Sequence, residues 1–538
     1  MSLAITSTLS QAIVEALRTL GVNTAPGAVN LERPAQREHG DWSTNAALVN
    51  AKGAGRKPRE LAAALVDWLN ANPPAHVTKV EMAGPGFVNF HLADTWLHEV
   101  LHLVVEEGTD GYAQEPPGTK PSINLEYVSA NPTGPLHAGH ARWAAYGDAL
   151  ARILSRAGHA VHREFYVNDR GVQMQLFGAS LAARRDGTAV PDNGYVGQYI
   201  RDWAVDMPDG VDPVLWGEAK AHTYQRDTLA RMNVIFDTWS SEKAIAASGA
   251  VEATIEELKQ AGHTYESEGA LWLRTTDYGD DKDRVLIKGD GDYTYFTPDI
   301  AFHQDKYTRG DLLIDVLGAD HDGYVGRMKA AMRCLGRPSE AIEMIIGQNC
   351  VLFRNGVEVK LSKRTGDIIE LAEIIDEVGA DAAKLTFLQQ SIGTALKVDL
   401  EAVKAKSMDN PVFYVQYAHA RVYGILREAA ERGMARRPLG TIDLAPLTHD
   451  RELDVLRSLA ELPDVVTNAA KERAPHKVTT WLRELAGAFQ GFYHDCPILR
   501  TDVAEEVRQA RLWLVEAARI GLVIGLCELL GVSAPERM

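Results

Sequence analysis

Two short motifs, far apart in the chain, contain residue types that suit a phosphate-handling site. The first is His137-Ala-Gly139-His140, and the second is Lys360-Leu-Ser362-Lys363-Arg364. Histidines and lysines can hold the phosphates of ATP and stabilise the charge that develops as pyrophosphate leaves. Neither motif is a glycine-rich Walker loop. Together, and in this order, they favour adenylyl transfer.

The first motif is expected at a turn between a strand and a helix. Residues 123–129 are typical of a buried strand end, and residues 141–157 are rich in Ala and Leu, which indicates a helix. His137 and His140 would share one face of the first helical turn, where free N–H groups and the helix dipole attract anions. Gly139 has no Cβ, so a base or a phosphate could approach the backbone. The alternative is a capped helix with two surface histidines.

The second motif is expected to follow a β-hairpin. Residues 351–353 and 357–359 are apolar enough for two strands, and the Asn355-Gly356 pair between them is a strong turn signal. Cations in a loop of small residues would suit a departing pyrophosphate, and an acidic helix is expected over 367–378. The alternative for this segment alone is a solvated basic loop.

Length and composition are those of a large intracellular protein. A chain of 538 residues should contain three or more domains. Its four cysteines are scattered without a CxxC spacing, so neither a zinc site nor a disulfide framework is indicated, and we expect a reducing cytoplasm. The apolar run over 520–530 is too short to span a bilayer. The net charge of −17 argues against a nucleic-acid binder that is basic overall. A large acidic protein can still carry local basic tracks that bind nucleic acid.

The residues flanking the two motifs resemble the arginyl-tRNA synthetases, a family of the class I aminoacyl-tRNA synthetases. The HAGH and KLSKR pair carries the resemblance to the class. Four further segments point to arginine: residues 126–131, 295–299, 39–45 and 410–421. The resemblance covers nearly the whole chain.

This resemblance implies an α/β multidomain fold with three parts. An α+β domain over residues 1–110 would bind the tRNA elbow, and an all-α domain over 405–538 would bind the anticodon. Between them, residues 118–390 would form a Rossmann-like catalytic domain with a parallel sheet, interrupted by an insertion at about 190–285. A linker is expected over 111–122, which is rich in proline and glycine.

The implied activity is ligation of L-arginine to tRNA(Arg) through an arginyl-adenylate. ATP would be a substrate, accompanied by Mg²⁺, with no protein-bound metal. By resemblance, the ATP contacts would come from His137, Gly139, His140, His321, Lys360 and Lys363, and the catalytic set would also include Ser362. The resemblance also implies that tRNA must bind before activation proceeds.

The arginine pocket needs carboxylates, because a guanidinium pairs best with them in a two-pronged geometry. By resemblance, the pocket would be lined by Glu126, Ser129, Asn131, His137, Tyr295 and Asp299. Glu126 could instead form a structural ion pair. Asp299 could instead be a helix N-cap, since residues 298–300 are compatible with a helix start.

Contacts with tRNA are expected from Asn45 in the N-terminal domain and from Tyr417 and Arg421 in the C-terminal domain. Asn45 could hydrogen-bond an exposed base, and an aromatic such as Trp42 could stack on one. A helix cap at Ser43 or Thr44 is the alternative for the first segment. Burial of Phe413, Tyr417 and Ala420 in the core is the alternative for the second.

Two other functions remain open at this stage. A class I synthetase for cysteine or glutamate is weakened by the lack of a Cys/His cluster and by acidic rather than basic pocket candidates. A catalytically silent tRNA-binding paralogue is weakened by the intact motifs. We expect a monomer with no membrane contact.

Overall fold

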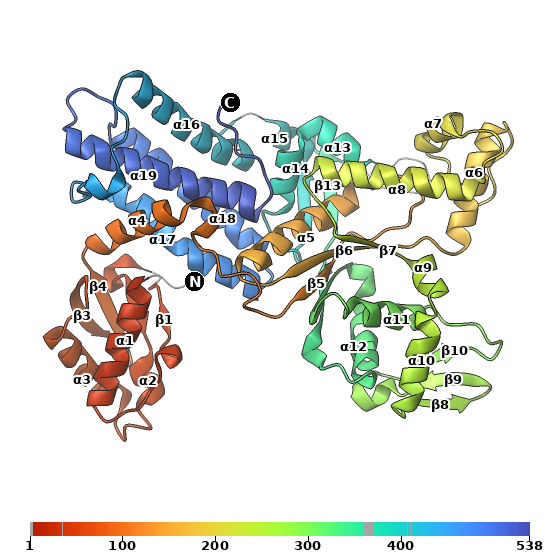
Figure 1. Ribbon diagram of the computed structural model, residues 1–538, viewed down its shortest axis with the longest axis horizontal. Coiled ribbons are helices and arrows are strands. Elements are labelled where there is room, and N and C mark those ends of the chain that lie inside the picture. The colour runs from red at the N-terminus through yellow and green to blue at the C-terminus, as the bar shows by residue number, and fades with distance from the viewer. Residues whose placement is uncertain (1–3, 35, 360–368, 406, 409) are drawn as a thin grey trace.

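A five-stranded parallel sheet lies at the centre of the protein, in a computed structural model that describes every residue except 1–3, 35, 360–368, 406 and 409 (Figure 1). The strand order is β12-β11-β5-β6-β7, with all neighbours parallel. Mostly apolar runs such as Leu312–Gly318, which is interrupted only by Asp315, form its buried strands, as expected for a sheet covered on both faces. The strands are β5 (Ile123–Glu126), β6 (Val161–Val167), β7 (Thr238–Ser241), β11 (Leu312–Gly318) and β12 (Ile342–Gly347).

Helix α5 (Ala138–Arg156) follows β5 and is buried along most of its length. The predicted helix is confirmed, although it begins three residues earlier than residue 141. Its alanines allow close packing against α14 (Ala380–Phe387) and against the C-terminal helices. The first motif therefore lies at the junction between the central sheet and the helical part of the molecule.

Two inserted units lie on either side of β7 in the chain. The first contains α6 (Val172–Arg185), α7 (Gln198–Asp206) and α8 (Pro213–Arg231), which share an apolar cluster of their own. The expected single insertion over about 190–285 is therefore divided, because β7 pairs with β6 in the central sheet. Only four half-buried residues form β7, too few for a recognisable strand pattern. The second unit contains α9 (Glu242–Ala247), α10 (Ala250–Gln260), β8 (Thr264–Ser267), β9 (Ala270–Leu273) and β10 (Arg284–Ile287).

The chain then returns to the central sheet and forms the predicted hairpin. Helices α11 (Phe296–Lys306) and α12 (Val325–Cys334) flank β11. Strands β13 (Cys350–Arg354) and β14 (Val357–Glu358) are antiparallel, with Asn355 and Gly356 at φ 52° and 74° between them. Positive φ at both positions is the geometry of a type I′ hairpin turn, so this prediction is confirmed. Strand β15 (Leu396–Asp399) pairs with β13, and α13 (Leu371–Val378) and α15 (Leu400–Lys404) lie nearby in the chain.

The N-terminal domain is an antiparallel sheet covered by helices. Its strand order is β1-β2-β4-β3, and Figure 1 shows it in red beside the helical domain. The elements are α1 (Ala4–Thr19), β1 (Leu31–Glu32), β2 (Trp42–Thr44), α2 (Ala46–Asn50), α3 (Pro58–Ala71), β3 (Val77–Ala83) and β4 (Phe87–Leu92). The α+β prediction for this part is confirmed.

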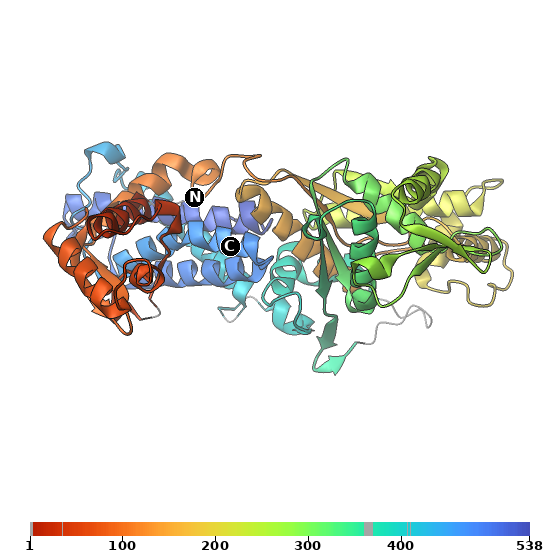
Figure 2. The ribbon, with the colours of Figure 1, turned by 90° about the horizontal axis from the view of Figure 1, so that it is seen from below.

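Helix α4 (Thr95–Gly111) packs on the C-terminal helices rather than on the N-terminal sheet. It contacts α17 (Asp450–Lys471) and α19 (Glu505–Val523), and Figure 2 shows it above that bundle. The segment that follows α4 is attached to α17, because the hydroxyl of the buried Tyr112 donates a hydrogen bond to the Leu459 carbonyl at 2.7 Å. The C-terminal domain is helical, as predicted, and also contains α16 (Pro411–Glu431) and α18 (Pro475–Asp495).

Candidate active site

The turn between β5 and α5 is held by reciprocal histidine–backbone hydrogen bonds. His137 is the N-cap of α5, and its Nδ1 accepts from the Gly139 amide at 3.1 Å. The His137 amide in turn donates to Nδ1 of His140 at 3.1 Å. The two ring centroids are 3.9 Å apart. These bonds place both histidines on one face of the first helical turn, which confirms the predicted position of the motif.

Gly139 is required by the His137 ring. A Cβ at this position would lie 2.8 Å from Cε1 of His137 and 2.9 Å from its Nδ1. Any other residue would push the imidazole out of its capping position. Glycine is therefore needed here to leave room for the His137 ring. From the sequence alone, the same glycine is explained by the approach of a ligand to the backbone.

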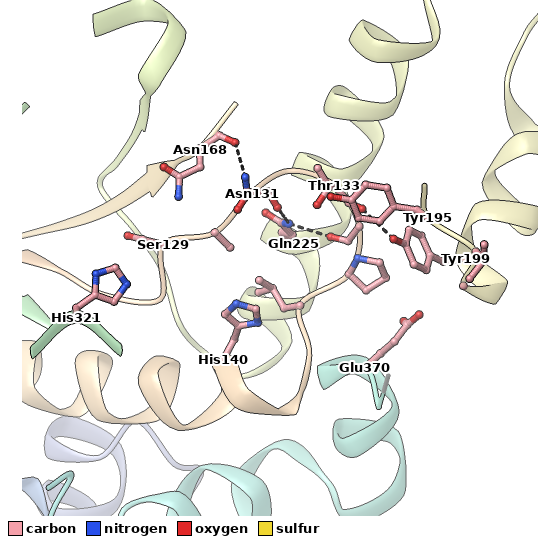
Figure 3. A pocket seen from close by; sticks show the side chains of 16 residues that line it. Ser129, Asn131, Thr133, His140, Asn168, Tyr195, Tyr199, Gln225, His321 and Glu370 are labelled. Carbon is pink, nitrogen blue, oxygen red and sulfur yellow. Dashed lines mark hydrogen bonds between the residues drawn. The ribbon is translucent and has the colours of Figure 1, made fainter. Parts of the chain in front are cut away.

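A cavity of about 250 Å³ opens beside this turn (Figure 3). It brings together four residues predicted for the site: Ser129 and Asn131 from the turn after β5, His140 from α5 and His321 from the segment after β11. All four lie at the carboxyl ends of parallel strands or on the helix that follows, which is where ligands bind in open α/β sheets. The other lining residues are Ala130, Thr133, Gly134, Pro135, Leu136, Asn168, Tyr195, Val196, Gly197, Tyr199, Gln225 and Glu370.

Several lining side chains come from the first inserted unit, and sequence analysis missed them. Gln225 of α8 is 1% exposed, and its Nε2 donates to the Asn131 and Gly134 carbonyls at 3.1 and 2.9 Å. Tyr199 of α7 donates its hydroxyl to the Thr133 carbonyl at 3.0 Å. Figure 3 shows Gln225 beside Asn131 and Tyr199 near Thr133, each joined to the turn by dashed hydrogen bonds. No local motif marks them, because their role depends on how the inserted helices dock.

Glu126, one of the residues predicted for the arginine pocket, belongs to a network of buried charges. Glu126 and Asp315 both accept from Lys306, each at 2.5 Å, and Asp315 also bonds His303 at 2.8 Å. Burial raises the pKa of Glu126 despite the Lys306 ammonium. Burial acts in the same direction on Asp315, but Lys306 and His303 hold its pKa below the usual range. The ion-pair alternative for Glu126 is thus realised, and its remaining oxygen accepts from Ser129 at 2.8 Å.

Asp299 lies inside α11, not at its N-cap. The helix begins at Phe296, and Tyr295 occupies the cap position without a side-chain capping bond, so the capping alternative for Asp299 is wrong. The Asp299 carboxylate is half-buried and accepts from the Tyr324 hydroxyl at 3.0 Å. Burial raises its pKa, and His303 and Tyr324 only partly offset this effect. Tyr295 itself is 95% exposed.

A second carboxylate near Asp299 was also missed from the sequence. Glu242 begins α9 at the carboxyl end of β7, and burial raises its pKa. Asp299 and the buried Asp169 lie close enough to raise it further, whereas Arg170 lowers it. A group of carboxylates that are costly to ionise without a cation is suited to a guanidinium. Only the placement of β7 in the central sheet reveals Glu242.

The second motif lies outside the described residues, so Lys360, Ser362 and Lys363 stay predictions. The segment that follows it is ordered against the first motif: the Ala138 amide donates to the Ile369 carbonyl at 3.0 Å, and Leu371 donates to Leu136 at 2.7 Å. Within the described ranges, no group of three or more His, Cys, Asp or Glu side chains could hold a metal ion. No helix among them is both long and apolar enough to cross a membrane.

The predicted tRNA contacts in the N-terminal domain have unequal support. Asn45 is the half-buried N-cap residue of α2, but it makes no side-chain capping bond, and the Thr44 hydroxyl accepts from the Ala46 amide instead. Trp42 is 2% exposed beneath the Arg33 guanidinium, so it cannot stack on a base. Asn45 as a tRNA contact stays a prediction.

On α16, the aromatic face lies at the surface rather than in the core. Phe413 and Tyr417 are half-buried, with their rings stacked 5.8 Å apart. Arg421 lies over the rings of Tyr417 and Tyr493 at 4.6 and 4.4 Å. The core alternative for Phe413 and Tyr417 is therefore wrong, and their exposure is compatible with base contacts.

Comparisons with known proteins agree in every domain. The model described as "Arginyl tRNA synthetase N terminal domain" matches residues 7–92, and "DALR anticodon binding domain" matches 415–538. The model "tRNA synthetases class I (R), catalytic domain" matches residues 102–195 and 213–410. Helix α7 falls in the gap between these two ranges.

Individual relatives extend over the full length. An arginine–tRNA ligase of Frankia alni is 46% identical over 533 residues, which cover 96% of this chain and 96% of the relative. That of Symbiobacterium thermophilum is 42% identical over 557 residues, covering 99% of each. The structure of the Thermus thermophilus arginyl-tRNA synthetase has the same fold, with a TM-score of 0.78 at 22% identity over 98% of this chain and 99% of that one. The chain belongs to the arginyl-tRNA synthetase family, within class I.

Proposed function

We propose that the protein ligates L-arginine to tRNA(Arg) in two steps, with ATP as the energy source. The observation that carries this proposal is the cavity at the carboxyl ends of β5, β6 and β11, which is lined by His140 of the first class I motif and by His321. Full-length similarity to arginine–tRNA ligases at 42–46% identity supports the choice of arginine.

ATP binds along the turn that begins α5. His137 and His140 contact the α-phosphate and the triphosphate, since the helix N-terminus presents N–H groups and a favourable dipole there. Lys360, Ser362 and Lys363 hold the departing pyrophosphate. His321 approaches the adenosine from the segment after β11, where it lines the same cavity. Mg²⁺ arrives with ATP as part of the substrate.

The arginine guanidinium binds on the acidic side of the site. Asp299 and Glu242 provide the carboxylates, and burial raises the pKa of both, so ionisation without a bound cation is unfavourable. A guanidinium relieves this penalty by pairing with them. Glu126 acts from beneath, where its bond to Ser129 orients the turn that carries Asn131. Tyr295, which is exposed at the start of α11, contacts the arginine from the solvent side.

The chemistry requires no nucleophile from the protein. A carboxylate oxygen of arginine attacks the α-phosphorus, a mixed anhydride forms, and pyrophosphate leaves. The 2′-hydroxyl of the terminal adenosine of tRNA then attacks the carbonyl carbon, and AMP leaves. The protein orients the reactants and stabilises the charge on phosphorus.

Transfer RNA contacts both ends of the protein. Asn45 belongs to the N-terminal surface that meets the elbow, and the Tyr417–Arg421 pair belongs to the anticodon surface, where aromatic and guanidinium planes can stack on unpaired bases. We expect a monomer. The scattered free cysteines support a reducing compartment such as the cytoplasm.

The decisive test is exchange of pyrophosphate into ATP, measured with each of the twenty amino acids, with and without tRNA(Arg). Exchange should depend on arginine, and it should require tRNA. Exchange that depends on a different amino acid would replace the substrate assignment. Absence of any exchange, in a protein that still binds tRNA, would favour the silent paralogue.

A further inference from the structure

The first inserted unit is attached to the catalytic turn by three side-chain bonds that none of the predicted roles uses. Gln225 donates to both ends of the Asn131–Gly134 turn, and Tyr199 donates to the Thr133 carbonyl within it. Three of the four main-chain carbonyls of this turn, those of Asn131, Thr133 and Gly134, therefore accept from helices that are far away in the sequence. A loop with its carbonyls so fixed has little freedom to change its path.

A fourth bond holds the other side of the same motif. Tyr224, the neighbour of Gln225 on α8, donates its hydroxyl to Glu370 at 2.8 Å. Glu370 lies in the short segment whose main chain pairs with residues 136–138, as an isolated antiparallel bridge to His137 shows. Consecutive residues of one helix thus hold the two segments that bracket the start of α5.

The turn and the inserted helices are closely packed against each other. Gly134 has φ 147°, and a Cβ there would lie 2.7 Å from the ring carbons of Tyr199. Gln225 is almost completely buried, and its Oε1 has no hydrogen-bond partner among the described residues, so the amide is held there through its donor nitrogen alone.

We propose that Gln225, Tyr224 and Tyr199 are positioning residues for adenylate formation, and that α7 and α8 hold the His137–His140 turn in its reactive geometry. None of the three needs to touch the reacting atoms. They act through main-chain carbonyls and through Glu370, and the reaction is sensitive because a misplacement of about 1 Å can cost roughly 100-fold in rate. The kinetic part of this inference rests on the proposed function.

The principal variant is Gln225→Met, which keeps the length of the side chain and removes both donated hydrogen bonds. The matched control is Thr228→Val, one turn further along α8. Thr228 is also buried, and its hydroxyl donates only to the Tyr224 carbonyl at 2.8 Å, so this control loses a buried hydrogen bond without losing a bond to the turn. Both variants are compared at a temperature at which circular dichroism shows them folded.

In tRNA-dependent pyrophosphate exchange, Gln225→Met should lower kcat about 100-fold relative to Thr228→Val, while the KM for arginine stays within about threefold. Tyr199→Phe is the second variant, and it replaces Gln225→Met if the latter fails to fold. It removes one hydroxyl from a half-buried side chain, and it should lower kcat about 5- to 10-fold. A kcat within threefold of the control for a folded Gln225→Met, or an unchanged kcat for Tyr199→Phe, would overturn the proposal.

A second measurement does not depend on activity. Hydrogen–deuterium exchange of the His137 and Gly139 amides, which the capping bonds of α5 protect, should become faster in Gln225→Met but not in Thr228→Val. Equal protection in the two variants would refute the positioning role. If the wild-type protein shows no pyrophosphate exchange but the variants show the expected hydrogen–deuterium exchange, the proposed function is refuted. The inference that α7 and α8 hold the turn would then still stand.

Discussion

The two sides of the catalytic centre are built by different physical means. On the proposed ATP side, the turn after β5 is held by hydrogen bonds from inserted helices, chiefly from the buried Gln225. On the proposed arginine side, half-buried carboxylates lie near one another, and burial raises the pKa values of Asp299 and Glu242. We therefore expect catalysis on the first side to depend on geometry, and arginine binding on the second side to depend on charge. Substitutions should therefore separate kcat from arginine binding.

The largest effect is expected on the ATP side. His140→Ala should slow activation by roughly 10²–10³, as for loss of a transition-state donor, while the KM for arginine changes little. His140→Asn is the matched variant, since its side-chain oxygen can still accept from the His137 amide and preserve the cap. Single-turnover rates with saturating arginine measure the effect. Near-normal activation by folded His140→Ala would remove this histidine from the mechanism.

On the arginine side, Asp299→Asn should weaken arginine binding by about 10- to 100-fold, because a charge-assisted pair is lost while the Tyr324 bond can be kept. The KM for ATP should stay nearly constant. Equilibrium binding of arginine and initial rates with varied ATP distinguish the two parameters. If arginine dependence is unchanged, Asp299 does not meet the guanidinium.

The same variant should become more stable at neutral pH. A carboxyl whose pKa is raised by burial contributes stability below its unfolded-state pKa, and this contribution is lost as the pH rises through the higher folded-state value. An amide carries no such penalty. The thermal midpoint of Asp299→Asn should therefore exceed that of the wild type at pH 7.5, and the difference should shrink as the pH is lowered. A destabilised variant at neutral pH would mean that the carboxylate is paired in the free enzyme.

A smaller effect is expected from pH alone. Protonation removes the charge that pairs with arginine, so the KM for arginine should rise as the pH falls, beginning above the range of an ordinary aspartate. The KM for ATP should not follow this curve, and Asp299→Asn should show a flatter one. If the KM values for arginine and for ATP changed with pH in the same way, the two sides would not differ in their dependence on charge.

The smallest effect on the catalytic centre should come from removing the N-terminal domain. Deletion of residues 1–93 should raise the tRNA concentration needed for charging and leave ATP binding unchanged, with a weaker defect at low salt. The boundary matters because α4 packs on α17 and α19, so removal of residues 1–110 would expose their apolar surface. Charging is measured against tRNA concentration at two salt levels. An unchanged tRNA dependence would mean that the domain serves something else.

The sequence by itself determined the motifs, the hairpin and the fold class. The HAGH turn and the Asn355-Gly356 hairpin were predictable because local backbone preferences and side-chain periodicity decide such elements within a few residues. The buried strand at β11 was predictable for the same reason. The charged region around β7 has no comparable local signal, so its division into two inserted units was not predictable.

Only the tertiary structure decided which side chains meet at the site. Glu242 joins Asp299 because β7 pairs with β6, and Glu126 is held by Lys306, which is 180 residues later in the chain. Gln225 reaches the catalytic turn because α8 docks across it. Each of these contacts joins segments that are distant in the sequence, and its free energy depends on burial, which no local pattern encodes.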